Sequence, residues 1–198
     1  TYGDWSSDVC SSDLATFGFV AWDQTSGTAS TNATPSYANP GAGGGTTAYS
    51  SQSASASLTV TSVNDAPTIT NAATVTLTST NEDTTSSATL VSSILTSASW
   101  ADVDTGALSG IAITSKSGNG TWQYSTDGVT WNGFGAVSSS NALLLTSGAQ
   151  VRYLPDGQNG EAATFGFVAW DQTSGTASTN ATPSYANPGA GGGTSAYS

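Results

Sequence analysis

The sequence predicts an all-β protein composed of antiparallel β-sandwich domains in tandem repeats. Short runs in which β-branched or aromatic residues alternate with polar ones recur along the chain, as in TVTLT at 74–78 and TWQYS at 121–125. Turn-forming sequences separate these runs, including SGNG at 117–120 and PDGQNG at 155–160. Helical periodicity is nearly absent, and many short strands at this spacing are typical of a β-sandwich.

The alternation of apolar and polar residues defines the individual strands. In TVTLT, Val75 and Leu77 share one face and the threonines share the other, which is typical of an antiparallel sheet with one solvated face. Ile111 with Ile113, and Trp122 with Tyr124, repeat the pattern. In chain order, we expect strands at 74–78, 110–114, 121–125, 142–146, 150–154 and 164–171.

The last of these strands differs from the others because both of its faces are apolar. Phe165 and Phe167 occupy one face, and Val168 and Trp170 occupy the other. We therefore expect a central strand that is covered on both sides. The Gly- and Pro-rich residues 172–193 that follow are expected to form a large surface loop.

The chain contains a long internal duplication. Residues 15–50, which begin ATFGFVAWDQTSG, recur at 163–198 with 35 of 36 positions identical, and Ser195 replacing Thr47 is the one difference. The two copies are 148 residues apart, a period of domain size rather than of a solenoid repeat.

The duplication sets the expected domain boundaries. We expect residues 15–62 to be the C-terminal part of one repeat and 63–198 to be the next repeat without its final strand, which should resemble residues 54–63. Residues 1–14 do not match the repeat, and DWSSDVCSSDL at 4–14 resembles the translation of a short-read sequencing adapter. We expect that segment to be an artefact.

Composition excludes several classes of function. The net charge of −11 comes from 13 acidic residues against Lys116 and Arg152, so a basic groove for nucleic acid is not available. The chain has no His and one Cys, Cys10, which removes a Ser-His-Asp triad and the usual imidazole metal sites. Asp102 and Asp104 lie in a polar loop with no evident apolar pocket, which argues against an enzyme. No apolar run is long enough to insert into a membrane.

Four motifs carry a resemblance to a known family. They are VNDAPTI at 63–69, NEDT at 81–84, ADVDTGAL at 101–108 and LPDGQNGEAATFGFVAWD at 154–171. From about residue 51 onward, the sequence resembles bacterial cadherin-like tandem repeats, which are joined by a VNDAP linker in large secreted adhesins and biofilm matrix proteins. The resemblance implies an Ig/cadherin-like sandwich in a protein that is secreted or held on the bacterial cell surface.

The resemblance also implies Ca²⁺ at or near the domain junctions. The residues at the matching motif positions are Asn64, Asp65, Glu82, Asp83, Asp102 and Asp104. Ca²⁺ takes six to eight oxygen ligands, and alternate aspartates in a loop aim two carboxylates at one point. The linker lacks the further upstream aspartate of animal cadherin linkers. A structural alternative is that these residues cap turns and solvate loops, as Asp and Asn do in many β proteins.

The function expected from these features is that of a structural repeat unit in an extracellular adhesin or surface fibre, with neighbouring copies as partners. A repeat that lacks a strand leaves a sheet edge open, and an open edge is a template for strand addition. The strand-donation candidates in this chain are Ser57, Leu58, Thr59, Val60 and Thr61.

An alternative function is a carbohydrate- or surface-binding module. In that interpretation, the long Gly-rich loop presents Tyr37 in the first copy and Tyr185 in the second to surface glycans. A tolerated insertion with no binding role explains the same loop.

Overall fold

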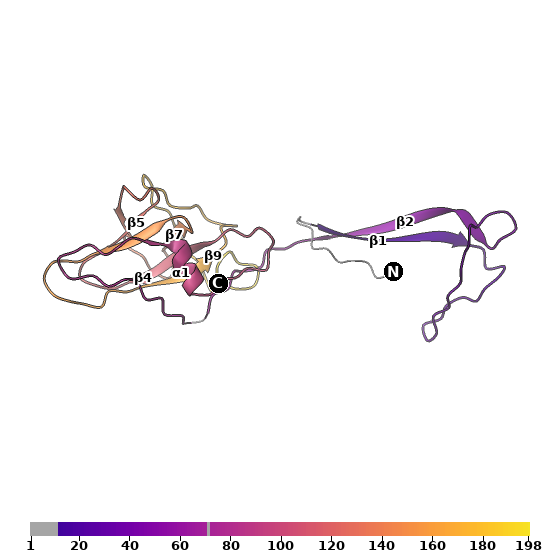
Figure 1. Ribbon diagram of the computed structural model, residues 1–198, viewed down its shortest axis with the longest axis horizontal. Helices are drawn as coiled ribbons and strands as arrows, with labels where there is room; N and C mark the ends of the chain where they lie inside the picture. Colours follow the sequence, from indigo (N-terminus) through magenta and orange to yellow (C-terminus); the bar gives the residue numbers. More distant parts are fainter. Residues whose placement is uncertain (1–11, 71) are drawn as a thin grey trace. The chain divides into compact units, whose positions relative to one another are not determined.

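The computed structural model describes residues 12–70 and 72–198 (Figure 1). The chain divides into two compact units, Thr1–Ser62 and Val63–Ser198. Most of the segment that we expect to be an artefact, including Cys10, lies outside the described residues. Its last three residues, 12–14, begin the first strand.

The first unit contains one two-stranded antiparallel sheet. Strand β1 (Ser12–Trp22) pairs with β2 (Tyr49–Thr61), with Thr16 opposite Ser57 and Val20 opposite Ser53. Its apolar side chains remain in water: Phe17 is 66% exposed and Leu58 is 65% exposed. A two-stranded sheet without a covered face is marginally stable at best.

The second unit contains two four-stranded antiparallel sheets, which we call sheet I and sheet II. Sheet I contains, in spatial order, β10 (Tyr185–Ala186), β7 (Ala142–Thr146), β4 (Gly110–Lys116) and β9 (Phe165–Trp170). Sheet II contains β3 (Thr89–Leu90), β8 (Gln150–Leu154), β5 (Thr121–Ser125) and β6 (Asn132–Gly133). The expected all-β class is confirmed.

One core lies between the two sheets. Ile111 on β4 and Leu145 on β7 meet Tyr124 on β5 and Val151 on β8, and all four are fully buried. Trp122 of sheet II lies with its ring centroid 4.9 Å from that of Phe165 in sheet I, edge to face. Edge-to-face contact is a favoured geometry for aromatic pairs.

A second apolar layer covers the outer face of sheet I. Leu144 on β7 and Trp170 on β9 pack there against Ala196 and Tyr197, which come from the long segment after β9. Both faces of β9 are therefore covered, as the sequence predicts. The strand is nevertheless not central among the described residues, because β4 is its one neighbour in sheet I.

Two local expectations were wrong. Residues 74–78 form no strand, although Val75 and Leu77 do pack against the core. The helix α1 (Val91–Ser97) was not foreseen. It is short and Ser-rich, and its buried residues are Val91, Ile94 and Leu95. Its first amides donate to the loop carbonyls of Ala149 and Ser147 rather than to a side-chain cap, so its position depends on the tertiary fold.

Glu161, in the loop between β8 and β9, holds the turn between β4 and β5 next to strand β8. Its carboxylate accepts hydrogen bonds from the Tyr153 hydroxyl, from the Asn119 amide at 2.7 Å and from the Gly120 amide at 3.4 Å. Hydrogen bonds from the Tyr153 hydroxyl and then from the Asn119 amide lower the pKa of Glu161. Burial, followed by the Glu161 contact, raises the pKa of Tyr153.

A pH-dependent loss of stability is expected from this contact. Because the pKa of Glu161 is lower in the folded chain, its stabilising effect is full above the unfolded pKa and is lost as the pH falls through the folded pKa. Glu161→Gln should lower the melting temperature at about pH 7 and lose that difference as the pH falls through the folded pKa of Glu161. Tyr153→Phe should act in the same direction. A difference in melting temperature between Glu161→Gln and wild type that is the same at every pH would contradict this prediction.

Candidate functional site

The aspartates of the DxD motif lie beside the start of the second unit. Thr68 and Ala101 pair through two backbone hydrogen bonds of 2.8 and 2.9 Å, which place residues 64–68 next to the loop that carries the motif. The Asp65 amide then donates to Asp104 Oδ2 at 2.8 Å, and the Asp104 amide donates to Asp102 Oδ1 at 2.9 Å. Asp65, Asp102 and Asp104 therefore belong to one hydrogen-bonded group.

One oxygen of this group has no protein partner. Asp102 Oδ2 is buried and accepts no hydrogen bond from the described residues. A buried carboxylate oxygen without a partner is unfavourable, and a cation is one way to satisfy it. The donors present are oxygens, which are the ligands that Ca²⁺ prefers.

Asn64 connects the linker to the end of β9 through its side-chain amide. Its amide Nδ2 donates to Asp171 Oδ2 at 2.9 Å, directly after β9. The other oxygen of Asp171 accepts from the Thr173 amide at 2.8 Å and the Thr173 hydroxyl at 2.6 Å. Asp171 is 2% exposed, so the linker is tied to the end of β9 by a buried contact.

Asp171 is a functional candidate that the sequence motifs do not single out. The D-x-T turn was visible in both copies, and Asp23 makes the same two contacts with Thr25. The Thr25 hydroxyl is the main cause that lowers the pKa of Asp23. The contact between Asn64 and Asp171 crosses 107 residues of sequence, and no local pattern indicates it.

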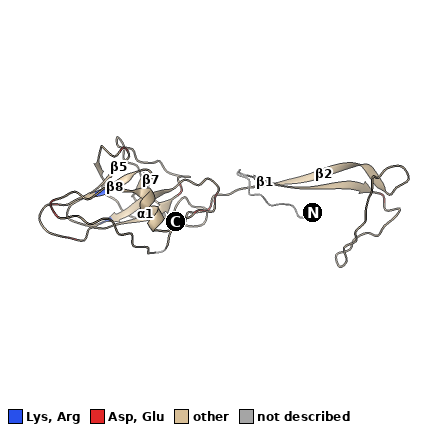
Figure 2. Ribbon diagram, in the orientation of Figure 1, with Lys and Arg blue, Asp and Glu red and all other residues tan. Residues whose placement is uncertain are grey.

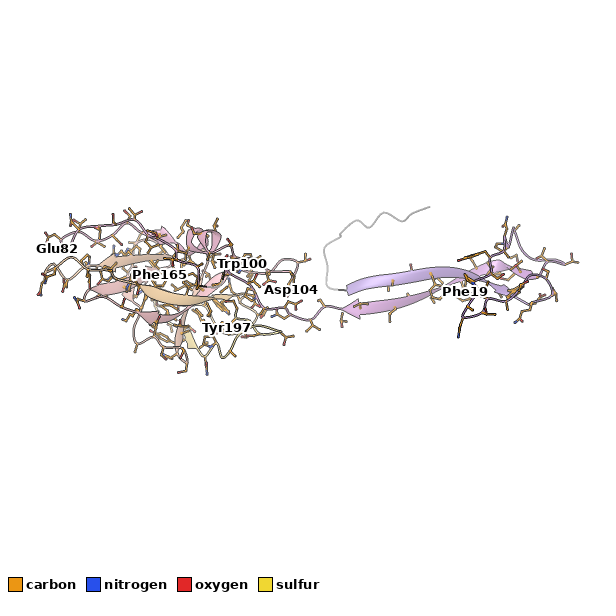
Figure 3. All side chains as sticks on the ribbon, turned by 90° about the horizontal axis from the view of Figure 1, so that it is seen from below. Phe19, Glu82, Trp100, Asp104, Phe165 and Tyr197 are labelled. Carbon is orange, nitrogen blue, oxygen red and sulfur yellow. The ribbon has the colours of Figure 1, made fainter. Side chains whose placement is uncertain are left out.

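Glu82 and Asp83 do not join the other metal candidates. Figure 3 shows Glu82 at the opposite end of the second unit from Asp104. The Asp83 amide donates to Asn81 Oδ1 at 3.1 Å, which is a local turn contact. In the part of the chain that the structure describes, no three His, Cys, Asp or Glu side chains gather into a ready metal site.

The two cations lie in the second unit and form no basic patch together (Figure 2). Arg152 on β8 donates from Nε to Gln123 Oε1 at 2.8 Å, and its guanidinium lies 4.0 Å from the centroid of a Trp131 ring. This stacking is a cation–π contact, which holds the arginine against the surface of sheet II. Lys116 ends β4 in the other sheet.

The tyrosine of the long loop is part of the second unit's packing. Tyr185 lies on β10 beside the core, and its hydroxyl donates to the Phe134 carbonyl at 3.1 Å. The buried Tyr124 also donates to this segment, at Thr179, and burial is the main cause that raises the pKa of Tyr124. Tyr37, at the equivalent position of the first copy, is 89% exposed.

The expectation of a surface loop at 172–193 was therefore wrong in part. The segment contains β10, and with the residues that follow it supplies Ser178, Ala196 and Tyr197 to the buried part of the unit. Its Gly and Pro residues do forbid a long regular element, but isolated apolar residues between the turns are sufficient to cover sheet I.

The strand-donation candidates lie in the second half of β2. Residues 57–61 pair with 12–16 of β1, and Leu58 and Val60 are both exposed. A separate groove of about 760 Å³ runs along β9 in the second unit. It is lined by residues 165–168, by 65–70 of the linker segment, by Ala72, Ala73 and Val103, and by Gly192, Gly193 and Ser198 from the segment after β9.

No helix in the described ranges has the length and apolarity needed to cross a bilayer. Comparisons with models of known families, with curated proteins and with solved structures found no match.

The equivalent residues Tyr185 and Tyr37 test how much the packing of Tyr185 contributes to stability. Tyr185→Phe removes the hydrogen bond to Phe134 and should lower the free energy of unfolding of the second unit by about 0.5–1.5 kcal/mol. Tyr37→Phe changes an exposed side chain of the first unit and should change the free energy of unfolding of that unit by less than about 0.5 kcal/mol. Urea unfolding measures both, and equal effects would show that the Tyr185 contact does not contribute.

Proposed function

We propose that this chain is a structural repeat unit of an extracellular adhesin or surface fibre, secreted or held on the bacterial cell surface. The units are Ig/cadherin-like β-sandwiches in tandem, and neighbouring copies of the repeat are the partners. The observation that carries the proposal is the 35-of-36 duplication. Copying a unit almost without change makes a protein longer and repetitive, which suits a structural role better than catalysis of a single reaction.

The duplicated sequence also makes the same local contacts in both units, which supports a modular repeat. The indole Nε1 of Trp22 donates to a carbonyl four residues further along at 2.8 Å, and Trp170 does the same at 2.7 Å. Trp22 pairs with Tyr49 and Trp170 pairs with Tyr197, both antiparallel.

The two sheets with their shared core support the sandwich part of the proposal. Sheet I and sheet II each have four antiparallel strands, and their facing side chains form one apolar cluster. Ig-like domains also pack two antiparallel sheets around one core, so this feature supports the proposed assignment.

Ca²⁺ is the proposed cofactor, and its ligands come from the group at the start of the second unit. Asp102, Asp104 and Asp65 would hold the ion, with Asn64 adjacent in the linker. The unpartnered Asp102 Oδ2 supports this assignment. Bound Ca²⁺ would fix the linker residues against the DxD loop, and Glu82 and Asp83 would take no part.

Titration with Ca²⁺ tests the cofactor. The ion should raise the melting temperature of the second unit, because a ligand at a hundredfold excess over its Kd stabilises by about 2.7 kcal/mol. Asp102→Asn with Asp104→Asn should abolish the shift. Glu82→Gln with Asp83→Asn is the matched control at the other end of the unit, and should keep it. A melting curve of the intact chain that does not change with Ca²⁺ or with a chelator would remove calcium from the proposal.

The alternative function, glycan binding through the long loop, has less support because Tyr185 is used in packing. A glycan array separates the two functions. A structural repeat should give no specific signal, whereas a signal that Tyr37→Ala abolishes would favour the binding module and contradict the proposal.

A further inference from the structure

Three asparagines in the second unit are followed directly by a glycine. They are Asn119, Asn132 and Asn159, followed by Gly120, Gly133 and Gly160. Such a pair can react with itself, because glycine has no side chain to shield its backbone nitrogen from the neighbouring side-chain amide. Asparagine is for this reason one of the thermolabile residues of proteins. The three pairs differ in how firmly the structure holds their reacting atoms.

The reaction open to such a pair is deamidation through a cyclic imide. The glycine nitrogen loses its proton and attacks the asparagine Cγ, and a new C–N bond forms there. The bond from Cγ to the side-chain nitrogen breaks, and the amide leaves with that proton as ammonia. Water then opens the imide at either of its C–N bonds. One opening gives aspartate, and the other gives isoaspartate, whose backbone runs through the former side chain.

Hydrogen bonds and packing protect the pair at Asn119. The Gly120 amide donates to the Tyr153 hydroxyl at 2.6 Å and to Glu161 Oε1 at 3.4 Å. The neighbouring chain is so close that a Cβ added at Gly120 would clash with the Leu154 carbonyl oxygen. The attacking nitrogen therefore keeps its proton in a hydrogen bond, and the surrounding chain restricts the rotation that attack requires.

The pair at Asn132 is protected by a sheet. Asn132 and Gly133 form β6, which pairs with β5. The group that would leave is held as well, because Asn132 Nδ2 donates to the Asn180 carbonyl at 3.0 Å. Imide formation at this position would have to break the strand pairing and the side-chain contact first.

The pair at Asn159 has neither restraint. Asn159 and Gly160 are exposed, in the irregular segment between β8 and β9. The Gln158 amide donates to Asp156 Oδ1 at 3.1 Å, but neither the Asn159 side chain nor the Gly160 amide makes a hydrogen bond to a described residue. A Cβ added at Gly160 would meet no atom within 4 Å, so the space around the attacking nitrogen is open.

We propose that Asn159 is a site of spontaneous deamidation, in which the Gly160 nitrogen displaces the side-chain amide and solvent water completes the reaction. Ammonia is the leaving group, and the chain's own atoms supply the nucleophile. Each modified unit gains one negative charge, because a carboxyl group is ionised at neutral pH. That charge lies two residues before Glu161, in a turn that already carries Asp156. This inference goes beyond the proposed function and does not depend on it.

Incubation of the intact chain in mildly alkaline buffer tests the site. Peptide mass spectrometry follows the conversion of all three asparagines with time, and chromatography separates the aspartate product from the isoaspartate product. Asn159 should convert at least about tenfold faster than Asn119 or Asn132, because a protected pair reacts after local opening. It should give both products, and its rate should increase with pH because the attacking nitrogen must lose its proton.

The same incubation in guanidinium chloride separates the effect of structure from that of local sequence. Unfolding removes the contacts that protect Gly120 and Gly133. The three asparagines should then convert at rates within about threefold of one another.

Gly160→Ala should block the reaction without disturbing the fold. The added methyl group enters open space, and the φ of Gly160 lies outside the left-handed region, so the melting temperature should not change. The methyl group stands beside the attacking nitrogen and should slow conversion of Asn159 by at least about tenfold. Gly148→Ala is the matched control, because a Cβ there also meets no atom within 4 Å. It should leave the rate at Asn159 unchanged.

Several results would overturn the inference. One is a rate at Asn159 in the folded chain that is no higher than the rates at Asn119 and Asn132. Another is aspartate without isoaspartate, which would indicate direct hydrolysis of the side chain. A ranking that persists in guanidinium chloride would assign the difference to local sequence, and conversion that Gly160→Ala does not slow would exclude the Gly160 nitrogen as the nucleophile.

Discussion

The contact between Trp122 and Phe165 holds the two sheets of the second unit together, and most of the structure depends on it. Trp122 also contacts Phe134 and Tyr153, with ring centroids 6.0 and 4.9 Å away, so a single indole on β5 connects β8 and the residue that follows β6 to the edge strand of sheet I. Its Nε1 donates to the Ser117 carbonyl at 3.0 Å, which fixes the orientation of the ring. The position of β9, and therefore of the groove beside it, follows from this packing.

The duplicated sequence shows how much of that packing is tertiary. Phe17 and Phe165 occupy equivalent positions in identical sequence, yet Phe17 is exposed and Phe165 packs against the core. The backbone forms a strand in both places. Local sequence is therefore sufficient for the strand and its turn, whereas burial is supplied by Trp122 and its neighbours, which the first unit does not contain within the described residues.

Short apolar and aromatic runs between turn residues predicted β4, β5, β7, β8 and β9 well. Residues alternate with a period of two in β5 and β8, whereas β7 and β9 are apolar on both faces. These patterns failed where tertiary contacts decide the conformation. The helix α1 has three core residues in a Ser-rich background and begins on loop carbonyls, so neither a cap nor a long period reveals it. The positions of the motif residues also depend on tertiary contacts. Asp102 and Asp104 lie beside Asp65 because of one backbone bridge, and nothing in the linear pattern places Glu82 at the other end.

The near-identity of the two copies has a consequence for biosynthesis. Strands β1 and β9 have almost the same sequence, so the sequence alone hardly determines which of them β2 pairs with. Chains fold from the N-terminus while they are made, and β1 leaves the ribosome long before β9. The order of emergence would then assign β2 to its own hairpin first. Timing during translation, rather than a difference in affinity, would then keep β2 paired with β1.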